Sequence, residues 1–457
     1  MLVTMTPAPG EVWPAPFTDS PVHATVALPG SKSLTNRHLM LAALSNSPSR
    51  LTGVLVSRDT DLMIQALSTL GATFRRVNDD PTVLDVTPIR LSDTSGDLTI
   101  DAGLAGTVMR FIPGVAAGTH ATVRIDGDEQ SYARPMGPVV QGLRQAGAHI
   151  TGDSQEATTR LPLIVHGRGV LPGGIVRVDA GGSSQFISAL LLVGATFEHG
   201  LDLRHTGDHT PSPEHIEMTI TVLEAAGVEV EAPEPNRWIV HPSPITTPDT
   251  AVEPDLSNAG PYLAAAVVTG GRVTVPYWPQ HTTQIGDRWR EILPAFGATV
   301  TFEPTPGANY GDLTVTGTRD HNGQPVITGG GVLADLAELT PTTAALALLA
   351  DGPTRLANIA HLRGHETDRL VALNAEAAKL GATIEEGPDY LAYTGGYQLT
   401  GTTLDSYADH RMATFGAIVG LVVPNTLVHD VATTAKTMPD FPNAWTKLAA
   451  GERQIRA

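Results

Sequence analysis

Apolar residues at helical spacing recur along the chain, and each such stretch ends in a glycine followed by alternating β-type residues. The pattern occurs in ALSTLGATFRRV, GLRQAGAHITG, VLEAAGVEVEA, ILPAFGATVTF and EAAKLGATIEEG, whose glycines are Gly71, Gly147, Gly227, Gly297 and Gly381. The tail WTKLAAG ends in the same way at Gly451. Each instance predicts a helix, a glycine just beyond its C-terminus and a strand that leaves the turn. The chain is therefore expected to be an α/β protein.

The six junctions are spaced by about 70 to 84 residues. Helix-glycine-strand junctions are common in α/β proteins, and two or three could arise by chance, but six at near-regular spacing favour internal repetition. Six units divide naturally into three and three. The best candidate for the boundary between the two groups is HPSPITTPDTAVEPD, residues 241–255, because it holds four prolines and few apolar residues.

A second passage between the halves is expected near the Pro-Gly pair at 29–30, if the N-terminal strand belongs to the second domain. We therefore expect one domain over 30–248 and another formed by 1–29 together with 249–457. A cleft between two domains is a common place for a ligand, and the active site is expected there.

The amino-acid composition excludes several classes of ligand and functional site. Of 457 residues, 41% are hydrophobic and 17% charged, and the formal net charge is −18. No basic surplus is available to neutralise a nucleic-acid backbone, so small anions are more plausible ligands. The absence of cysteine excludes disulfides, thiolate metal sites and a thiol nucleophile. No apolar run approaches the length of a membrane span, and no Lys or Arg precedes Lys32, so a cytoplasmic protein is expected.

The first cationic motif is PGSKSLTNR at 29–37, followed by an apolar run. It places Ser31 or Ser33 near a helix start, where unpaired backbone N–H groups and the charges of Lys32 and Arg37 attract an anion. A Walker phosphate loop is excluded because Ser31, not glycine, precedes Lys32. The alternative is a capped helix whose charges are simply solvated.

Three further motifs in the first half have the same form. DAGLAGTVMRF sets Gly106 before an apolar helix that carries Arg110, and Gly106 could admit a ligand or be a plain turn glycine. SYARPMGP puts Arg134 directly before a proline that is expected to open a helix. DAGGSSQF presents Ser183, Ser184 and Gln185 at a helix start, where they could bind an oxyanion or only cap the helix.

The second half repeats this placement of charge. Glu338 precedes an apolar helix in LADLAELTPTTAALALLA, and Asp409, His410 and Arg411 open another in SYADHRMATFGAI. Lys436 precedes a proline in ATTAKTMPDF, and RGHETDRL at 363–370 carries a charge run that is usually a solvated helix face. Together the motifs predict an anion site built from both halves, with the cations Lys32, Arg37, Arg110, Arg134, Arg369, Arg411 and Lys436.

These motifs, in this order from about Pro29 to Phe441, resemble the 5-enolpyruvylshikimate-3-phosphate synthase family, the 3-phosphoshikimate 1-carboxyvinyltransferases. The resemblance implies a two-domain inside-out α/β barrel made of six βαβαββ units, three per domain. It also implies transfer of the enolpyruvyl group of phosphoenolpyruvate to the 5-hydroxyl of shikimate 3-phosphate, with release of phosphate, in chorismate and aromatic amino acid biosynthesis. No metal or other cofactor is implied, and a monomer is expected.

The family pattern also implies which residues bind each substrate. Those expected to hold shikimate 3-phosphate are Lys32, Ser33, Arg37, Ser183, Ser184, Gln185, Ser212, Glu338 and His365. Those expected to hold phosphoenolpyruvate are Lys32, Gly106, Arg134, Gln185, Arg369, Arg411 and Lys436. Lys32, Glu338 and Glu366 are the expected catalytic residues, because a hydroxyl must lose a proton while a methylene carbon gains one.

Three positions depart from the usual pattern. Glu338 stands where many members have Asp, His365 where many have Lys, and Leu104 where many have Asn. Two other functions remain open. The related transferase that acts on UDP-N-acetylglucosamine usually has Asn where Ser33 stands and often a loop cysteine, which this chain lacks. A non-enzymatic anion-binding scaffold is opposed by the presence of Lys32, Glu338 and Glu366.

Overall fold

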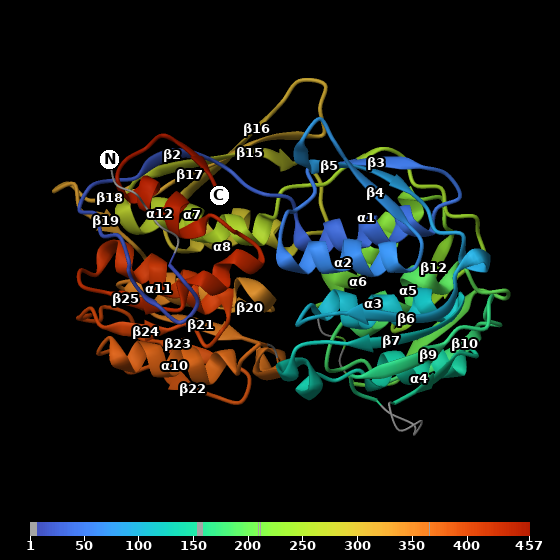
Figure 1. Ribbon diagram of the computed structural model, residues 1–457. Coiled ribbons are helices and arrows are strands. Elements are labelled where there is room, and N and C mark those ends of the chain that lie inside the picture. Colours follow the sequence, from blue (N-terminus) through green and yellow to red (C-terminus); the bar gives the residue numbers. More distant parts are fainter. Residues whose placement is uncertain (1–6, 153–158, 209, 211, 365) are drawn as a thin grey trace. The chain divides into compact units, whose positions relative to one another are not determined.

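The computed structural model describes residues 7–152, 159–208, 210, 212–364 and 366–457. The chain divides into two compact units, Gly30–Val252 and Met1–Pro29 with Glu253–Ala457 (Figure 1). The chain passes from one unit to the other at the Pro-Gly pair and again just before the N-cap of α7. Each unit is described separately below.

The described residues of the 30–252 unit form six α-helices, two short 3-10 helices and twelve strands. Its helices are α1 (Lys32–Leu44), α2 (Arg58–Thr69), α3 (Gly106–Ala117), α4 (Gly137–Gln145), α5 (Gln185–Gly194), α6 (Pro213–Ala225), η1 (Leu91–Asp93) and η2 (Glu129–Ala133). Its strands are β3 (Ser49–Thr52), β4 (Thr73–Val77), β5 (Asp80–Thr87), β6 (Ser95–Asp101), β7 (His120–Asp126), β8 (His149–Thr151), β9 (Leu163–His166), β10 (Gly174–Val178), β11 (Leu201–His205), β12 (Val230–Glu234), β13 (Arg237–Val240) and β14 (Thr250–Ala251).

The strands of this unit form three four-stranded sheets with the orders β14-β3-β5-β4, β6-β7-β9-β8 and β10-β11-β13-β12. All three share one pattern: the first two strands are parallel and the remaining pairs are antiparallel. In Figure 1 the helices α3 and α5 lie between these sheets. Every residue of α3 is buried, and so is every residue of α5 after Gln185.

In the other unit, the part of the chain that the structure describes forms six α-helices, four 3-10 helices and fourteen strands. Its helices are α7 (Leu256–Thr269), α8 (Trp289–Ala295), α9 (Thr340–Leu349), α10 (Arg369–Lys379), α11 (His410–Val422), α12 (Phe441–Ala449), η3 (Ile285–Arg288), η4 (Ala337–Leu339), η5 (Ala360–Gly364) and η6 (Val431–Lys436). Its strands are β1 (Val12–Pro14), β2 (His23–Ala27), β15 (Arg272–Pro279), β16 (Thr299–Pro304), β17 (Tyr310–Thr316), β18 (Thr318–Arg319), β19 (Pro325–Val326), β20 (Gly331–Ala334), β21 (Thr354–Ala357), β22 (Glu385–Glu386), β23 (Leu391–Tyr393), β24 (Thr403–Asp405), β25 (Leu427–His429) and β26 (Gln454–Arg456).

The sheet β20-β21-β23-β22 of this unit repeats the strand pattern of the first unit. The five-stranded sheet β16-β17-β15-β2-β26 contains the same pattern of one parallel pair followed by antiparallel pairs. Its strands β2 and β15 are parallel, and β17 is antiparallel to both β15 and β16. In the sheet β1-β25-β24, the N-terminal strand β1 lies antiparallel to β25. The helices α7, α9 and α11 are buried along almost their whole length. The α/β class predicted from the sequence is confirmed.

All six predicted helix-glycine-strand junctions are present. The helices α2, α4, α6, α8, α10 and α12 end one residue before the C-cap, and the glycine that follows has φ between +80° and +111°. A residue without Cβ adopts this left-handed conformation without strain, which explains why glycine stands at each junction.

One predicted helix start is wrong. The helix after Arg134 does not open at Pro135: Arg134 ends η2 in an extended conformation, and α4 begins at Gly137 with a proline in its first turn. A residue that precedes proline is disfavoured in the helical region, so Arg134 stays extended. Pro138 then takes the place at the helix start that we had assigned to Pro135.

Gly30, in the first cationic motif, has no room for a side chain. A Cβ built at Gly30 would lie 1.9 Å from the carbonyl oxygen of Gly53, whereas one at Gly118 would meet no atom closer than 3.5 Å. Gly30→Ala must therefore displace backbone, and we expect it to lower the free energy of unfolding by about 2 to 3 kcal/mol. Gly118→Ala should cause no loss. Urea denaturation of both variants checks this, and equal midpoints would show that the contact is not restrictive.

Candidate active site

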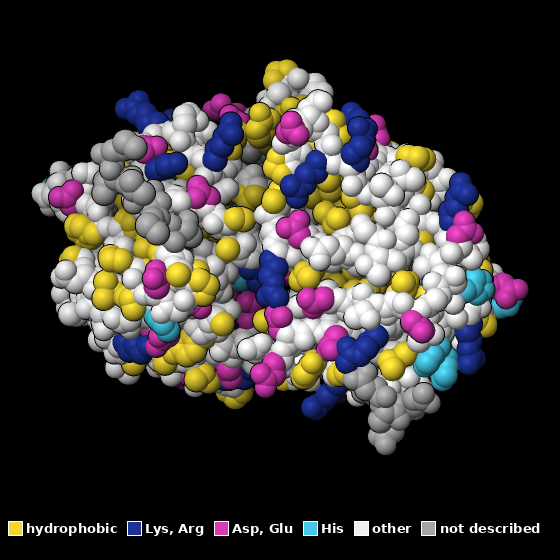
Figure 2. Space-filling view, viewed as in Figure 1, with side chains coloured by type: hydrophobic (Ala, Val, Ile, Leu, Met, Phe, Trp, Pro, Cys, Tyr) yellow, Lys and Arg dark blue, Asp and Glu magenta, His cyan; other side chains and the backbone are white. Residues whose placement is uncertain are grey.

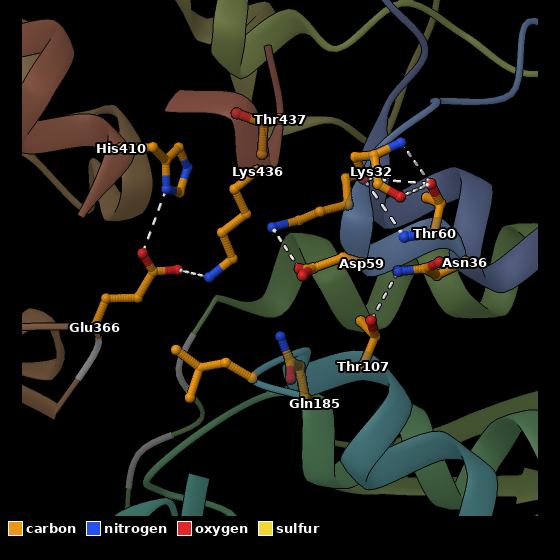
Figure 3. A network of polar contacts seen from close by, with 12 residues as sticks. Lys32, Asn36, Asp59, Thr60, Thr107, Gln185, Glu366, His410, Lys436 and Thr437 are labelled. Carbon is orange, nitrogen blue, oxygen red and sulfur yellow. Dashed lines mark hydrogen bonds and ion pairs between the residues drawn. The ribbon is translucent and has the colours of Figure 1, made fainter. Parts of the chain in front are cut away.

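Many of the predicted site residues lie at or near helix N-termini in both units, where unpaired backbone N–H groups are available to an anion. In the 30–252 unit, Ser31 is the N-cap of α1 and Lys32 is its first residue. The Nζ of Lys32 lies 3.6 Å from Oδ2 of Asp59, which is buried in the first turn of α2 (Figure 3). Asp59 thus holds the ammonium group of Lys32 within the unit.

Arg37 is buried, with 2% of its surface exposed. Its guanidinium donates to Thr219 Oγ1 at 2.8 Å, to the carbonyl of Ser33 at 2.9 Å, and to Ser188 Oγ and the carbonyl of His215, each at 3.1 Å. None of these acceptors is charged. Burial lowers the pKa of Arg37 to about 10, so the group remains a cation at neutral pH. One N–H of Nη1 has no acceptor among the described residues, and a ligand could use it.

Arg110, in the second turn of α3, meets Gln185, the first residue of α5. Nη1 of Arg110 donates to Oε1 of Gln185 at 2.5 Å, and the guanidinium lies 4.9 Å from the ring centroid of Phe186. Burial, with a contribution from Arg134, lowers the pKa of Arg110 to about 9. Because the amide oxygen of Gln185 accepts from Arg110, its NH₂ group is left to donate elsewhere.

Gly106 lies against this pair and against Arg134. A Cβ at Gly106 would stand 2.8 Å from Nη2 of Arg134 and 3.1 Å from Oε1 of Gln185. Nη1 of Arg134 donates to the carbonyl of Leu104 at 2.7 Å. This contact uses the backbone, so it does not depend on the identity of the side chain at position 104.

The predicted serines also lie at helix starts. Ser184 is the buried N-cap of α5, and Oγ of Ser183 accepts the N–H of Gln185 at 3.3 Å. Ser212 precedes α6 in a left-handed conformation with φ 47° and ψ 63°. Such a conformation is uncommon for a residue other than glycine.

In the other unit, Glu366 is held between two cationic or titratable groups (Figure 3). The Nζ of Lys436, from the end of η6, donates to Oε1 of Glu366, and Nδ1 of His410 lies 3.3 Å from Oε2. Burial lowers the pKa of His410, although Glu366 acts in the opposite direction. The imidazole is therefore neutral at physiological pH.

Arg369 and Asp409 form a buried ion pair beside this group. Nε and Nη2 of Arg369 donate to the two carboxylate oxygens of Asp409 at 2.7 and 3.2 Å. Burial opposes ionisation of both groups, yet the pair raises the pKa of Arg369 and lowers that of Asp409. Among the residues that the structure describes, the buried Nη1 of Arg369 has no hydrogen-bond partner, which leaves a donor for an anion.

The remaining residues of this half lie on the same helix starts. Arg411 is in the first turn of α11 and donates from Nη2 to Ser257 Oγ at 3.0 Å. Glu338 is in η4, just before α9, and its charge contributes to the raised pKa of Arg369. His365 lies outside the described residues. The RGHETDRL run is not a solvated helix face, because α10 begins only at Arg369, which is 2% exposed.

Glu366, Asp409 and His410 also offer ligand atoms within 4.8 Å of one another, a spacing that could hold a cation. Each carboxylate already has a cationic partner, Lys436 for Glu366 and Arg369 for Asp409. Two positive charges offset the two carboxylates, so the chemistry of the set favours an ion-pair network over a metal site.

Sequence reasoning missed two residues that hold site residues in place, Asp59 and Ser257, which contact Lys32 and Arg411. It placed Asp409 at a helix start but did not predict its ion pair with Arg369. Asp59 had a signal, since it stands at a helix start where an acidic residue is favourable. Ser257 had none beyond its place after an N-cap, because its partner lies 154 positions away.

Comparison with known proteins identifies the family. The model of the family described as EPSP synthase (3-phosphoshikimate 1-carboxyvinyltransferase) matches residues 17–445. A relative from Kocuria rhizophila, named 3-phosphoshikimate 1-carboxyvinyltransferase, is 51% identical over 451 residues, covering 97% of this chain and 98% of its own. The chain belongs to the EPSP synthase family. The resemblance stated from the motifs is confirmed.

Solved structures of EPSP synthases agree with the fold. Two structures from Acinetobacter baumannii superpose on 97% of the chain with a TM-score of 0.77 and 21% identity, covering 98% and 99% of their own chains. The chain therefore has the mixed α/β fold of EPSP synthases. Of the described helices, none is long and apolar enough to cross a membrane. Figure 2 shows Lys and Arg side chains dispersed among Asp and Glu on the viewed face.

The stability of the protein should depend on pH through His38, which follows Arg37 on α1. Burial, and then the charge of Arg37, lowers the pKa of His38 from 6.5 to about 4. The unfolded chain therefore takes up a proton first as the pH falls below about 6.5, and the free energy of unfolding should decrease by up to about 3 kcal/mol by pH 4.

Urea denaturation between pH 7 and pH 4 measures this decrease. His38→Gln removes the titrating group and should make the pH dependence shallower. An identical slope in the parent and the variant would contradict the assignment of the decrease to His38.

Proposed function

We propose that this EPSP synthase family protein is a 3-phosphoshikimate 1-carboxyvinyltransferase, which acts in the shikimate pathway to chorismate and the aromatic amino acids. It transfers the enolpyruvyl group of phosphoenolpyruvate to the 5-hydroxyl of shikimate 3-phosphate and releases inorganic phosphate. The observation that carries this function is the 51% identity to the Kocuria rhizophila enzyme of that name across nearly the whole of both chains.

The reaction is an addition followed by an elimination. The 5-hydroxyl oxygen bonds to C2 of phosphoenolpyruvate and gives up its proton, while the C3 methylene gains a proton and becomes a methyl group. The tetrahedral intermediate then loses a C3 proton, the bond from C2 to the phosphate oxygen breaks, and phosphate departs with the electron pair. Each half needs a proton acceptor and a proton donor, so carboxylates and a lysine suffice.

We assign these proton transfers to Lys32, Glu338 and Glu366. Glu338 accepts the proton of the 5-hydroxyl, and Glu366 exchanges the proton at C3. This assignment is supported by the contacts of Glu366 with Lys436 and His410, which fix both of its oxygens. Lys32 can lose its proton where an arginine effectively cannot, which accounts for a lysine in a chain that holds few of them.

The substrate contacts are proposed on the same basis. Shikimate 3-phosphate is bound by Lys32, Ser33, Arg37, Ser183, Ser184, Gln185, Ser212, Glu338 and His365. Phosphoenolpyruvate is bound by Lys32, Gly106, Arg134, Gln185, Arg369, Arg411 and Lys436. Support comes from Nη1 of Arg369, which has no partner in the described part of the chain, and from Arg37, whose described hydrogen-bond acceptors include no carboxylate. Both favour an anionic ligand.

We further propose that the fold consists of six βαβαββ units, that the protein is a monomer and that it acts in the cytoplasm. The six glycine junctions and the strand pattern shared by the sheets support the repeats. In this arrangement β1 supplies a strand to the last unit, and β2 pairs with β15 of the fourth.

A phosphate-release assay tests the function. Phosphate should appear only when shikimate 3-phosphate and phosphoenolpyruvate are both present, because neither substrate alone can form the tetrahedral intermediate. UDP-N-acetylglucosamine should neither replace shikimate 3-phosphate nor raise the melting temperature. A folded sample that released no phosphate from the two substrates together would refute the proposal, and activity with UDP-N-acetylglucosamine would favour the related transferase.

Gly106→Ala tests the phosphoenolpyruvate contacts. The added methyl group would stand 2.8 Å from Nη2 of Arg134 and must displace that side chain or the amide of Gln185. We expect the KM for phosphoenolpyruvate to rise about tenfold, equivalent to about 1.4 kcal/mol, and the KM for shikimate 3-phosphate to change much less. Steady-state kinetics with each substrate varied in turn measure both constants. An unchanged KM for phosphoenolpyruvate would exclude Gly106 from its site.

A further inference from the structure

Ser257, in the first turn of α7, contacts the side chain of Arg411. Its Oγ accepts a hydrogen bond from Nη2 of Arg411 at 3.0 Å, and only 8% of its surface is exposed. Among the residues that the structure describes, no other side chain or carbonyl is hydrogen-bonded to this guanidinium. Ser257 is therefore the protein group that decides where the guanidinium of Arg411 lies.

Asp255 determines which way the hydroxyl of Ser257 points. Oγ of Ser257 donates to Oδ1 of Asp255 at 2.7 Å. A serine hydroxyl has a single proton, so donation to the carboxylate leaves only lone pairs for Arg411. The serine oxygen is thus a fixed acceptor, strengthened by the neighbouring negative charge.

The carboxylate of Asp255 is itself held in place. It is the N-cap of α7 and accepts the N–H of Asn258 at 3.2 Å, and its own N–H donates to the carbonyl of Pro29 at 2.9 Å. The backbone of Arg411 is fixed independently, because its N–H donates to Oδ1 of Asp409, the N-cap of α11. The link from Asp255 through Ser257 to Arg411 therefore joins the starts of two buried helices.

We propose that Ser257 is a positioning residue for phosphoenolpyruvate: it presets the guanidinium of Arg411 before the substrate binds. The inference rests on the proposed function, in which Arg411 binds phosphoenolpyruvate. An arginine side chain has several rotatable bonds, and ordering it on binding reduces affinity. A guanidinium already fixed at Nη2 avoids that loss and keeps its other N–H groups for the ligand.

Three variants test the role of Ser257. Ser257→Ala removes the acceptor but leaves the cap formed by Asp255, whereas Ser257→Thr keeps a hydroxyl at the same position. Thr426→Val is the matched control, because it removes a buried hydroxyl near the other end of α11 whose bond stays within its own turn, to the carbonyl of Val423. The KM of each substrate, kcat and the melting temperature are measured for all of them.

We expect Ser257→Ala to raise the KM for phosphoenolpyruvate about tenfold and to change that for shikimate 3-phosphate by less than about twofold. Ser257→Thr should restore most of the loss, and Thr426→Val should behave as the parent does. A KM for phosphoenolpyruvate within about twofold of the parent value in Ser257→Ala would overturn the proposal. So would an equal rise in both KM values, since that would indicate a general structural defect.

The same experiment separates this inference from the proposed function. If the parent itself releases no phosphate from the two substrates, the function is wrong and Arg411 has no assigned ligand. If the parent is active and Ser257→Ala has parental kinetics, the function stands and only the positioning role of Ser257 fails.

Discussion

The structure depends on how positive charge is buried within its core helices. In the 30–252 unit, Arg37 and Arg110 are buried against hydroxyl, amide and carbonyl oxygens and an aromatic ring, with no carboxylate among their described contacts. Burying a cation in this way is costly unless dipoles replace the lost water. The hydroxyl and carbonyl oxygens around Arg37 supply these dipoles. They do not neutralise its charge, which stays available to an anion.

In the other unit, buried positive charge is paired with carboxylates instead. Its buried cation Arg369 is paired with Asp409, and Lys436 is paired with Glu366. Two carboxylates of this half, Asp409 and Glu366, are therefore each held by a cation. A protein with a net charge of −18 thus keeps a set of cations at helix starts that already favour anions.

The features that the sequence predicted are those set by local rules. A glycine after a helix must reach positive φ, so the six junctions could be identified from neighbouring residues alone. Of the predicted cations, Lys32, Arg369 and Arg411 lie in the first turn of a helix, whereas Arg37 and Arg110 lie in the second turn of theirs. The motif order carried the family assignment, which the comparisons confirm.

What the sequence did not predict depends on contacts between distant positions. Ser257 and Arg411 are 154 residues apart, and no local pattern links them. The pairing of β1 with β25 and of β2 with β15 joins strands from opposite ends of the chain. The prediction of a helix start at Pro135 was wrong because Pro138, not Pro135, stands in the first turn of α4. The extended backbone at Arg134 keeps Pro135 outside the helix.

The most direct test of this account is the affinity of the protein for shikimate 3-phosphate compared with that for shikimate, measured by isothermal titration calorimetry at one ionic strength. Hydrogen bonds to charged groups contribute about 1.5 to 3 kcal/mol each, so two such contacts to the phosphate should make the phosphorylated ligand bind at least about a hundredfold more tightly. Similar dissociation constants for the two ligands would show that the buried cations do not serve to bind a phosphorylated acid.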